Sequence, residues 1–167
     1  MKRLLSIFLI AILGIFAISC TSDDNGNYVD NDTIADVYDL KNINFDLDGN
    51  QYYVKRNFTQ PLYDSDVVLI YRQATVANGN PVWELMPRTY YVNEGEVDYT
   101  FDFTKNDVQI YAQATFNLTN TSYVRNQTFR VVVIPANFGK SANAINYENY
   151  NEVIARYNIN DKNVKNL

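Results

Sequence analysis

The sequence predicts an all-β domain, an antiparallel β-sandwich of the immunoglobulin-like kind with seven or eight short strands and a short C-terminal helix. From residue 35 onward, apolar and polar side chains mostly alternate, which is the period of half-buried strands. Turn-forming residues interrupt this pattern about every 8 to 12 residues. The chain has 14 tyrosines and only two methionines, which favours strands over helices. A small barrel is the alternative architecture.

Two stretches predict strands with one face in the core. Apolar residues occupy alternate positions from Val97 to Phe103, and Asp98, Thr100 and Asp102 lie between them. The stretch from Val108 to Phe116 repeats the pattern, with apolar residues at every even position. Such alternation is typical of antiparallel strands with one solvated face.

The remaining strands are predicted from shorter patterns. Residues 43–58 form a hairpin in which Gly49 supplies a positive φ. The turn resembles the opening of a calcium loop, but Gln51 stands where that loop requires glycine and no glutamate follows at position 12. We therefore interpret it as a hairpin turn. Further strands are expected at 67–76, 82–86, 88–92 and 127–134.

The C-terminal segment predicts a helix between Tyr147 and Tyr157. Pro135 ends the last strand, and Asn149 can cap the helix N-terminus. We expect the apolar stripe of the helix to pack on the end of the sandwich. The stripe has the helical spacing i, i+3, i+4, i+7 and comprises Tyr150, Val153, Ile154 and Tyr157.

The N-terminus predicts a signal peptide over residues 1–19. Lys2 and Arg3 precede an apolar run that ends at Ile18, which is too short to be a comfortable membrane span. The run closes with Ala17-Ile18-Ser19-Cys20, which resembles the lipobox cut by lipoprotein signal peptidase. Cys20 is the only cysteine, so an intrachain disulfide is excluded and lipidation would account for the thiol. Its acyl chains would anchor the protein to a membrane.

Residues 20–34 predict a disordered tether between the lipid and a folded domain at 35–167. The tether is polar and acidic and carries too little apolar surface to order itself. Ser22-Asp23-Asp24 resembles the acidic export signal that sends Bacteroidetes lipoproteins to the outer face of the outer membrane, and a plain acidic linker is the alternative. Thr33, in Asp32-Thr33-Ile34, matches a three-residue O-glycosylation motif of that phylum.

The composition argues against several functions. The net charge is −5, and it becomes −7 once Lys2 and Arg3 are removed with the leader. No basic cluster offsets this charge, so nucleic acid is not an expected partner. The chain has no histidine, which excludes His-dependent triads, Cys–His dyads and common zinc sites. We therefore predict no catalytic residue, metal or cofactor.

Carboxylate pairs are the remaining catalytic option. The acidic candidates lie in or beside turns, or on strand faces that the pattern predicts to be exposed. We accordingly keep a carboxylate-dependent hydrolase of polysaccharide only as the alternative function. The candidates are Glu84, Glu94, Glu96, Asp98 and Asp102.

A short internal repeat suggests a binding face. The segment from Ile70 to Thr75 has an echo 40 residues later, from Ile110 to Thr115. If the two strands were neighbours, their tyrosine, glutamine and threonine side chains would share one exposed face suited to a sugar or a protein. An ordinary solvated face, or a face covered by the C-terminal helix, is the alternative. The face would consist of Tyr71, Gln73, Thr75, Tyr111, Gln113 and Thr115.

Four core segments resemble a group of small uncharacterised lipoproteins from flavobacteria and related Bacteroidetes. They are Ser65–Arg72, Trp83 with Met86-Pro87, Tyr99–Thr104 and Phe129–Pro135. The resemblance covers about residues 35–157 and implies an outer-membrane lipoprotein with one all-β domain. Some members carry the label dihydrolipoamide dehydrogenase, but this sequence lacks a redox cysteine pair and a dinucleotide fingerprint. We therefore predict a non-enzymatic envelope or cell-surface lipoprotein that binds a glycan or protein or supports an assembly.

Overall fold

The computed structural model describes residues 35–135, 145–162 and 164–167. The chain divides into two compact units, Met1–Asp30 and Asn31–Leu167, and every described residue belongs to the second unit. The predicted signal peptide and the whole of the predicted tether lie outside the described residues. The description below concerns the second unit alone.

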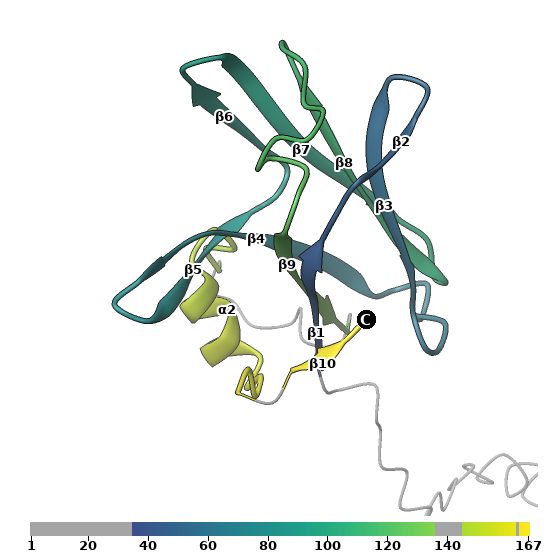
Figure 1. Ribbon diagram of the computed structural model, residues 1–167. Helices are drawn as coiled ribbons and strands as arrows, with labels where there is room; N and C mark the ends of the chain where they lie inside the picture. Colours follow the sequence, from purple (N-terminus) through teal and green to yellow (C-terminus); the bar gives the residue numbers. More distant parts are fainter. Residues whose placement is uncertain (1–34, 136–144, 163) are drawn as a thin grey trace, which may run out of the picture. The chain divides into compact units, whose positions relative to one another are not determined.

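The described residues form two five-stranded sheets and one short helix (Figure 1). Sheet A has the order β10-β1-β9-β4-β5, and sheet B has the order β2-β3-β8-β7-β6. The elements are β1 (Asp36–Ile43), β2 (Asp46–Asp48), β3 (Gln51–Asn57), β4 (Val67–Ala77), β5 (Asn80–Leu85), β6 (Arg88–Val92), β7 (Gly95–Phe103), β8 (Asp107–Ala114), β9 (Gln127–Ile134), α2 (Tyr150–Arg156) and β10 (Lys165–Asn166).

The mostly-β class is confirmed, with two corrections. The described residues hold ten strands rather than seven or eight. Sheet B is antiparallel throughout, but sheet A is mixed because β10 runs parallel to β1. The sequence did not indicate β10, since a two-residue strand carries no readable period. Sheet A otherwise contains only antiparallel pairs.

The predicted core faces of β7 and β8 are confirmed. Val97 and Tyr99 of β7 are fully buried, as is Ile110 of β8. Phe101 pairs with Ile110 and packs against the same core. Phe103 departs from the pattern and is 41% exposed, because it lies at the last position of β7, where the core ends.

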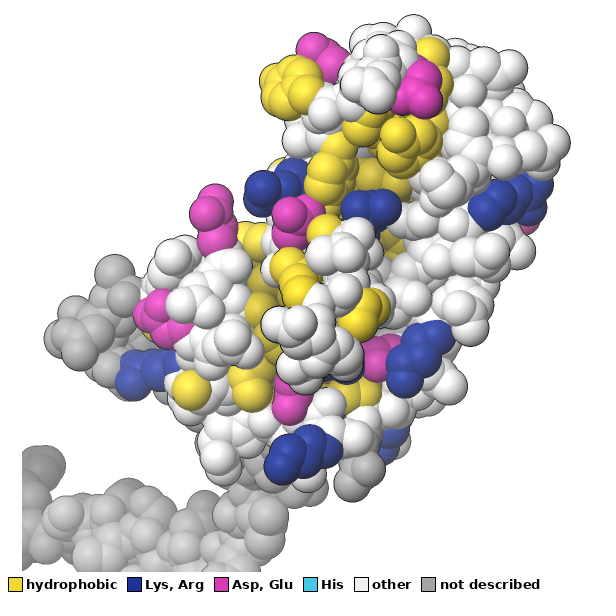
Figure 2. All heavy atoms as spheres, turned by 60° about the vertical axis from the view of Figure 1, so that its left-hand side comes forward, with side chains coloured by type: hydrophobic (Ala, Val, Ile, Leu, Met, Phe, Trp, Pro, Cys, Tyr) yellow, Lys and Arg dark blue, Asp and Glu magenta, His cyan; other side chains and the backbone are white. Residues whose placement is uncertain are grey.

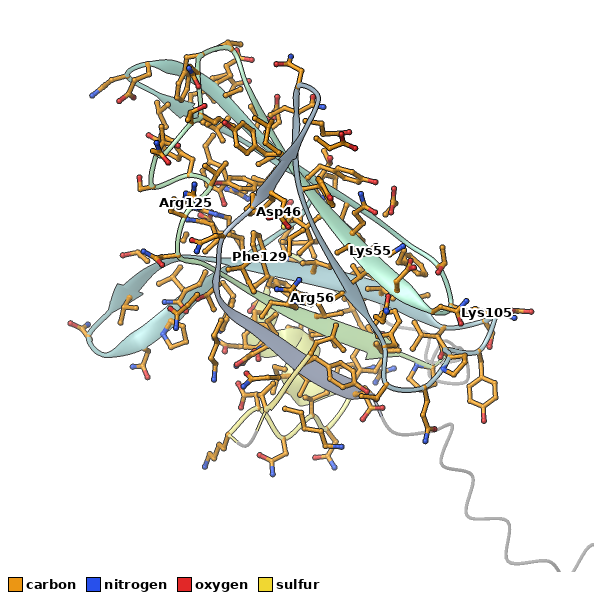
Figure 3. The ribbon with its side chains drawn as sticks, turned by 45° about the vertical axis from the view of Figure 1, so that its right-hand side comes forward. Asp46, Lys55, Arg56, Lys105, Arg125 and Phe129 are labelled. Carbon is orange, nitrogen blue, oxygen red and sulfur yellow. The ribbon has the colours of Figure 1, made fainter. Side chains whose placement is uncertain are left out.

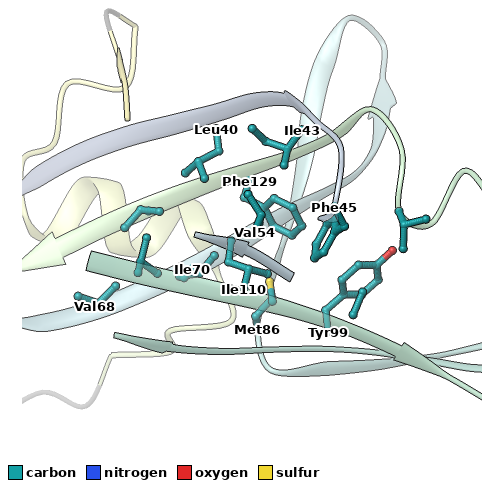
Figure 4. Close-up of a cluster of buried hydrophobic side chains, with 14 of the residues drawn as sticks. Leu40, Ile43, Phe45, Val54, Val68, Ile70, Met86, Tyr99, Ile110 and Phe129 are labelled. Carbon is teal, nitrogen blue, oxygen red and sulfur yellow. The ribbon is translucent and has the colours of Figure 1, made fainter. Parts of the chain in front are cut away.

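Aliphatic side chains and a few aromatic rings fill the space between the two sheets (Figure 4). The Phe129 ring of β9 lies 5.9 Å from the ring of Phe45 and 6.2 Å from that of Tyr99, centroid to centroid. Edge-on contacts of this kind suit the ring quadrupoles and add to the stabilisation from burial. Phe45 lies on the segment between β1 and β2 and thus contacts an aromatic ring of each sheet.

The hairpin at β2 and β3 is confirmed, and Gly49 has the expected positive φ of 57°. Strand β1 was missed as a separate strand. Its sequence does not alternate cleanly, and its pairing with β9 shifts register between Leu40 and Ile43. Asn42 has a φ of 55° at this irregularity. Non-local pairing with β9 therefore makes this segment a strand, and that pairing cannot be read from local alternation.

Helix α2 is confirmed, and Asn149 caps it by accepting a hydrogen bond from the backbone N–H of Glu152. Its position was predicted wrongly. The helix packs on the outer face of sheet A, against Tyr71 and Val132, rather than on the end of the sandwich. Those two residues alternate with core residues of the same strands, so sheet A is apolar on both faces.

A buried ion pair lies under the helix. The guanidinium of Arg130 donates Nε–H to Asp39 Oδ1 at 2.7 Å and Nη2–H to Asp39 Oδ2 at 2.9 Å. Arg130 is 6% exposed and Asp39 is 1% exposed. Arg130 also donates to the Tyr150 hydroxyl and lies 4.5 Å from the Trp83 ring centroid. Burial tends to lower the pKa of Arg130, but these hydrogen bonds outweigh it, so the pKa is raised.

The buried tyrosines predict a loss of stability at alkaline pH. Burial raises the pKa of Tyr99 to about 12 although the charge of Arg72 acts in the opposite direction. Burial also raises the pKa of Tyr71 and of Tyr150. A pKa raised on folding stabilises the fold below the unfolded value, near 10, and that stabilisation is lost as the pH rises through the folded value. We expect the free energy of unfolding to fall above about pH 10.

Spectrophotometric titration at 295 nm, followed together with circular dichroism, would measure this effect. A tyrosine side chain that stays in water should ionise near pH 10 while the fold persists. The buried tyrosines, Tyr71, Tyr99 and Tyr150, should ionise only as the fold is lost. Ionisation of every tyrosine near pH 10 in a still-folded protein would contradict the prediction.

Candidate functional site

A surface groove of about 650 Å³ lies beside the β2–β3 hairpin. We call it the hairpin groove. It lies between this hairpin, the end of β8 and the loop that follows β8. Its lining residues are Leu47, Asn50, Tyr52, Ala112, Gln113, Ala114, Thr115, Phe116, Asn117, Leu118 and Thr119.

Strand register aligns one wall of the groove. Leu47 pairs with Tyr52, and Tyr52 pairs with Ala112, so the three residues form a row across sheet B. Val54, two residues along β3 from Tyr52, is buried in the core between the sheets. Tyr52 therefore points to the inner face of sheet B, where it packs against the edge of the core.

The loop that forms the opposite wall is held by a hydrogen bond to β3 and by another within the loop. The hydroxyls of Tyr52 and Thr119 lie 2.8 Å apart. The Asn117 side-chain oxygen accepts a hydrogen bond from the backbone N–H of Thr119 at 2.8 Å. The neighbouring Leu118 is buried and anchors the loop to the core. The groove therefore has one sheet wall and one ordered loop wall.

None of the described residues that line the groove carries a charge. The walls combine amide and hydroxyl groups with exposed apolar surface, including Leu47, which is 54% exposed. Figure 2 shows a contrasting surface, over β5, β6 and α2, where acidic and basic side chains flank the hydrophobic ones. Neutral donors and acceptors beside an aromatic ring suit a ligand rich in hydroxyl groups and without charge.

The six-residue face predicted from the internal repeat does not assemble. Strands β4 and β8 lie in different sheets, so their side chains cannot share one surface. The repeat reflects similar environments instead, because Ile70 and Ile110 both point into the core between the sheets. Tyr71, Gln73 and Thr75 lie on β4 of sheet A, whereas Tyr111 and Gln113 lie on β8 of sheet B and Thr115 follows it.

Tyr71 is not available for binding. It is 0% exposed under α2, and its hydroxyl donates to the backbone carbonyl of Tyr147 at 2.7 Å. The alternative in which the C-terminal helix covers this face is therefore correct for Tyr71. The sequence could not locate the helix, because an amphipathic stripe does not specify the surface that receives it.

The residues on β8 are more accessible. Tyr111 lies on the outer face of sheet B, where its hydroxyl donates to Asp102 Oδ2 at 2.8 Å. Lys55, on the neighbouring β3, forms an ion pair with Asp107 at 2.7 Å (Figure 3). Gln113 and Thr115 line the hairpin groove. The structure thus brings two of the six predicted residues into the candidate site.

The remaining groove residues were not predicted as site residues. The sequence pattern predicted Leu47 and Tyr52 only as parts of a hairpin. An apolar residue exposed beside a turn can nevertheless indicate a binding surface. Asn117 and Thr119 belong to a polar loop that has no period. Their convergence depends on how the loop folds back on sheet B.

The acidic candidates do not line the groove. Glu84 accepts hydrogen bonds from the Tyr90 hydroxyl and lies 3.5 Å from Arg88 Nε. Asp98 accepts from the Thr89 hydroxyl. Among residues 35–135, 145–162 and 164–167, no group of three or more potential ligand side chains is placed to hold a metal ion. Cys20 and Thr33 lie outside the described residues.

The described residues thus define a mostly-β domain of two sheets with an uncharged surface groove. Within them, no helix is long and apolar enough to cross a membrane. Comparison with protein-family models, curated proteins and solved structures finds no match to this chain. The functional argument therefore depends on the residues themselves.

Proposed function

We propose that the protein is a non-enzymatic, lipid-anchored surface protein of the outer membrane whose hairpin groove binds a neutral glycan. The observation that carries the binding proposal is the groove itself, which offers amides, hydroxyls and one tyrosine ring without any charged side chain. A sugar presents hydroxyl groups to such amides and a flat C–H face to such a ring. The volume of about 650 Å³ is within the range of ligand sites.

The anchor in this proposal rests on the sequence. Cys20 would carry the lipid, residues 20–34 would form the tether, and Ser22-Asp23-Asp24 would direct surface export. The resemblance to flavobacterial lipoproteins and an immunoglobulin-like strand topology belong to the same proposal. Protease treatment of intact cells should release the domain if the tether faces the medium. A domain protected from protease until the outer membrane is opened would place it in the periplasm instead.

The binding proposal is tested by replacing Tyr52. Neutral oligosaccharides from a glycan array would be titrated calorimetrically against the full-length protein in detergent. We expect Tyr52→Ala to weaken binding about tenfold, equivalent to roughly 1.4 kcal/mol, because the ring forms part of the groove wall. Thr119→Val should weaken it through loss of a hydroxyl group.

Tyr53→Ala is the matched control. Tyr53 is adjacent on β3, does not line the groove, and pairs with Tyr111 on the opposite face of sheet B. Its replacement should leave the affinity within about twofold. Equal losses in both variants, or no glycan bound by the folded protein, would contradict the proposal. Turnover of a polysaccharide would favour the hydrolase alternative.

A further inference from the structure

A second pocket contains Arg72, for which no acidic partner lies among the described residues. Arg72 lies on β4, and its guanidinium carbon is 4.9 Å from the ring centroid of Tyr90 and 4.6 Å from that of Tyr99. Both tyrosines belong to sheet B, so the guanidinium bridges the two sheets at the edge of the core. Contacts with aromatic rings stabilise a cation but leave its charge in place.

Gln127 fixes the orientation of this guanidinium. Arg72 donates Nε–H to Gln127 Oε1 at 2.8 Å. The Gln127 Nε2 group donates to the backbone carbonyls of Ser122 and Arg125. Both amide hydrogens of Gln127 are therefore engaged, which holds its oxygen toward Arg72. The guanidinium is preorganised rather than mobile.

Arg72 and Arg130 both lie on strands of sheet A, but they differ in their counter-charges. Arg130 is neutralised by the buried Asp39. No carboxylate among the described residues lies within ion-pairing distance of Arg72. Glu84 is its cross-strand neighbour on β5, but that carboxylate is directed to Tyr90 and Arg88. The charge of Arg72 is therefore not balanced by a direct ion pair among the described residues.

Arg72 lines a pocket of about 320 Å³ whose other residues are uncharged. The pocket lies between β4 and the segment that leads into β9. Amide and hydroxyl groups provide most of its polar lining, and no acidic side chain contributes. The lining residues besides Arg72 are Gln73, Ala74, Ser122, Tyr123, Asn126, Gln127 and Thr128.

We propose that this pocket binds the carboxylate of a small hydroxylated acid, such as a uronic acid, through the guanidinium of Arg72. The planar fork of arginine matches a carboxylate, and one positive charge balances one negative charge. A phosphate carries nearly two negative charges, so the single positive charge of Arg72 would neutralise only part of its charge. The amides and hydroxyls around Arg72 can bind the hydroxyl groups of the same ligand. This proposal does not depend on the hairpin groove.

A comparison of glucuronate with glucuronamide tests the proposal on the unmodified protein. The two differ only at C6, where a neutral amide replaces the charged carboxylate. Calorimetric titration of the full-length protein in detergent should show binding of glucuronate at least tenfold tighter than that of glucuronamide. The difference should shrink as salt is raised. Acetate and inorganic phosphate, titrated separately, should bind more weakly than glucuronate.

Two arginine variants complete the test. Arg72→Lys keeps the charge but removes the fork, and should weaken glucuronate binding about tenfold. Arg125→Lys is the matched control. Arg125 (Figure 3) lies on the segment before β9 that also carries Ser122 and Asn126, but it does not line the pocket. It should change the affinity less than twofold.

Three results would overturn the proposal. They are equal binding of the acid and the amide, tighter binding of phosphate or acetate than of glucuronate, and no binding of glucuronate. Arg72→Lys should leave neutral glycan binding at Tyr52 unchanged, so the two proposals can fail separately.

Discussion

Replacing Asp39 by alanine should lower the free energy of unfolding by about 3–5 kcal/mol. The carboxylate of Asp39 receives two hydrogen bonds from Arg130, and both residues are almost fully buried. Without it, the guanidinium would lie in an apolar layer with only Asp161, at 3.6 Å and partly exposed, as an acidic neighbour. An uncompensated buried charge is costly because it has lost its water without gaining a partner. Urea unfolding of the purified protein would measure the change.

Two controls separate the buried charge from the loss of packing. Asp36→Ala removes an exposed carboxylate from the same strand and should change stability by less than about 0.5 kcal/mol. The double variant Asp39→Leu with Arg130→Met removes both charges and should be more stable than Asp39→Ala alone. A double variant as unstable as Asp39→Ala would show that the packing, and not the unpaired charge, determines the loss.

Replacing Phe129 by alanine should destabilise the fold by about 3–5 kcal/mol. The ring is fully buried between the sheets and contacts the rings of Phe45 and Tyr99. Its removal leaves a cavity that strands on both sides are too constrained to fill. Thermal and urea unfolding should both report the loss, with an unchanged dependence on urea concentration if the folded state stays compact.

Phe103→Ala is the matched control for this variant. It makes the same chemical change at the end of β7, where the side chain is 41% exposed. We expect a clearly smaller loss than for Phe129→Ala, because the Phe103 side chain keeps 41% of its surface exposed and its removal leaves no enclosed cavity. Similar losses at both positions would contradict the assignment of Phe129 to the centre of the core.

Much of the fold could be predicted because local pattern and tertiary burial agree. Strands β7 and β8 alternate cleanly, and their apolar residues do face the core. The hairpin at Gly49 follows from turn chemistry, since only a few residue types accept a positive φ. Helix α2 follows from the spacing of its stripe and from the cap at Asn149. Each of these features is encoded within about ten residues.

The candidate site was predicted only in part. Gln113 and Thr115 line the hairpin groove, but the face they were expected to share with Tyr71 does not exist. The repeat at residues 70–75 and 110–115 correctly indicated similar environments. It did not indicate adjacency, because two strands in opposite sheets can have the same alternation.

The sequence by itself determined the strands other than β1 and β10, the inward faces of β7 and β8, and the helix, because these depend on the spacing of apolar residues along the chain. Tertiary structure alone decided that α2 covers Tyr71, that Tyr52 and Thr119 form one groove, and that Asp39 neutralises Arg130. The last pair is separated by 91 residues. Contacts over such distances depend on strand order and on the packing of sheets, which local periodicity does not specify.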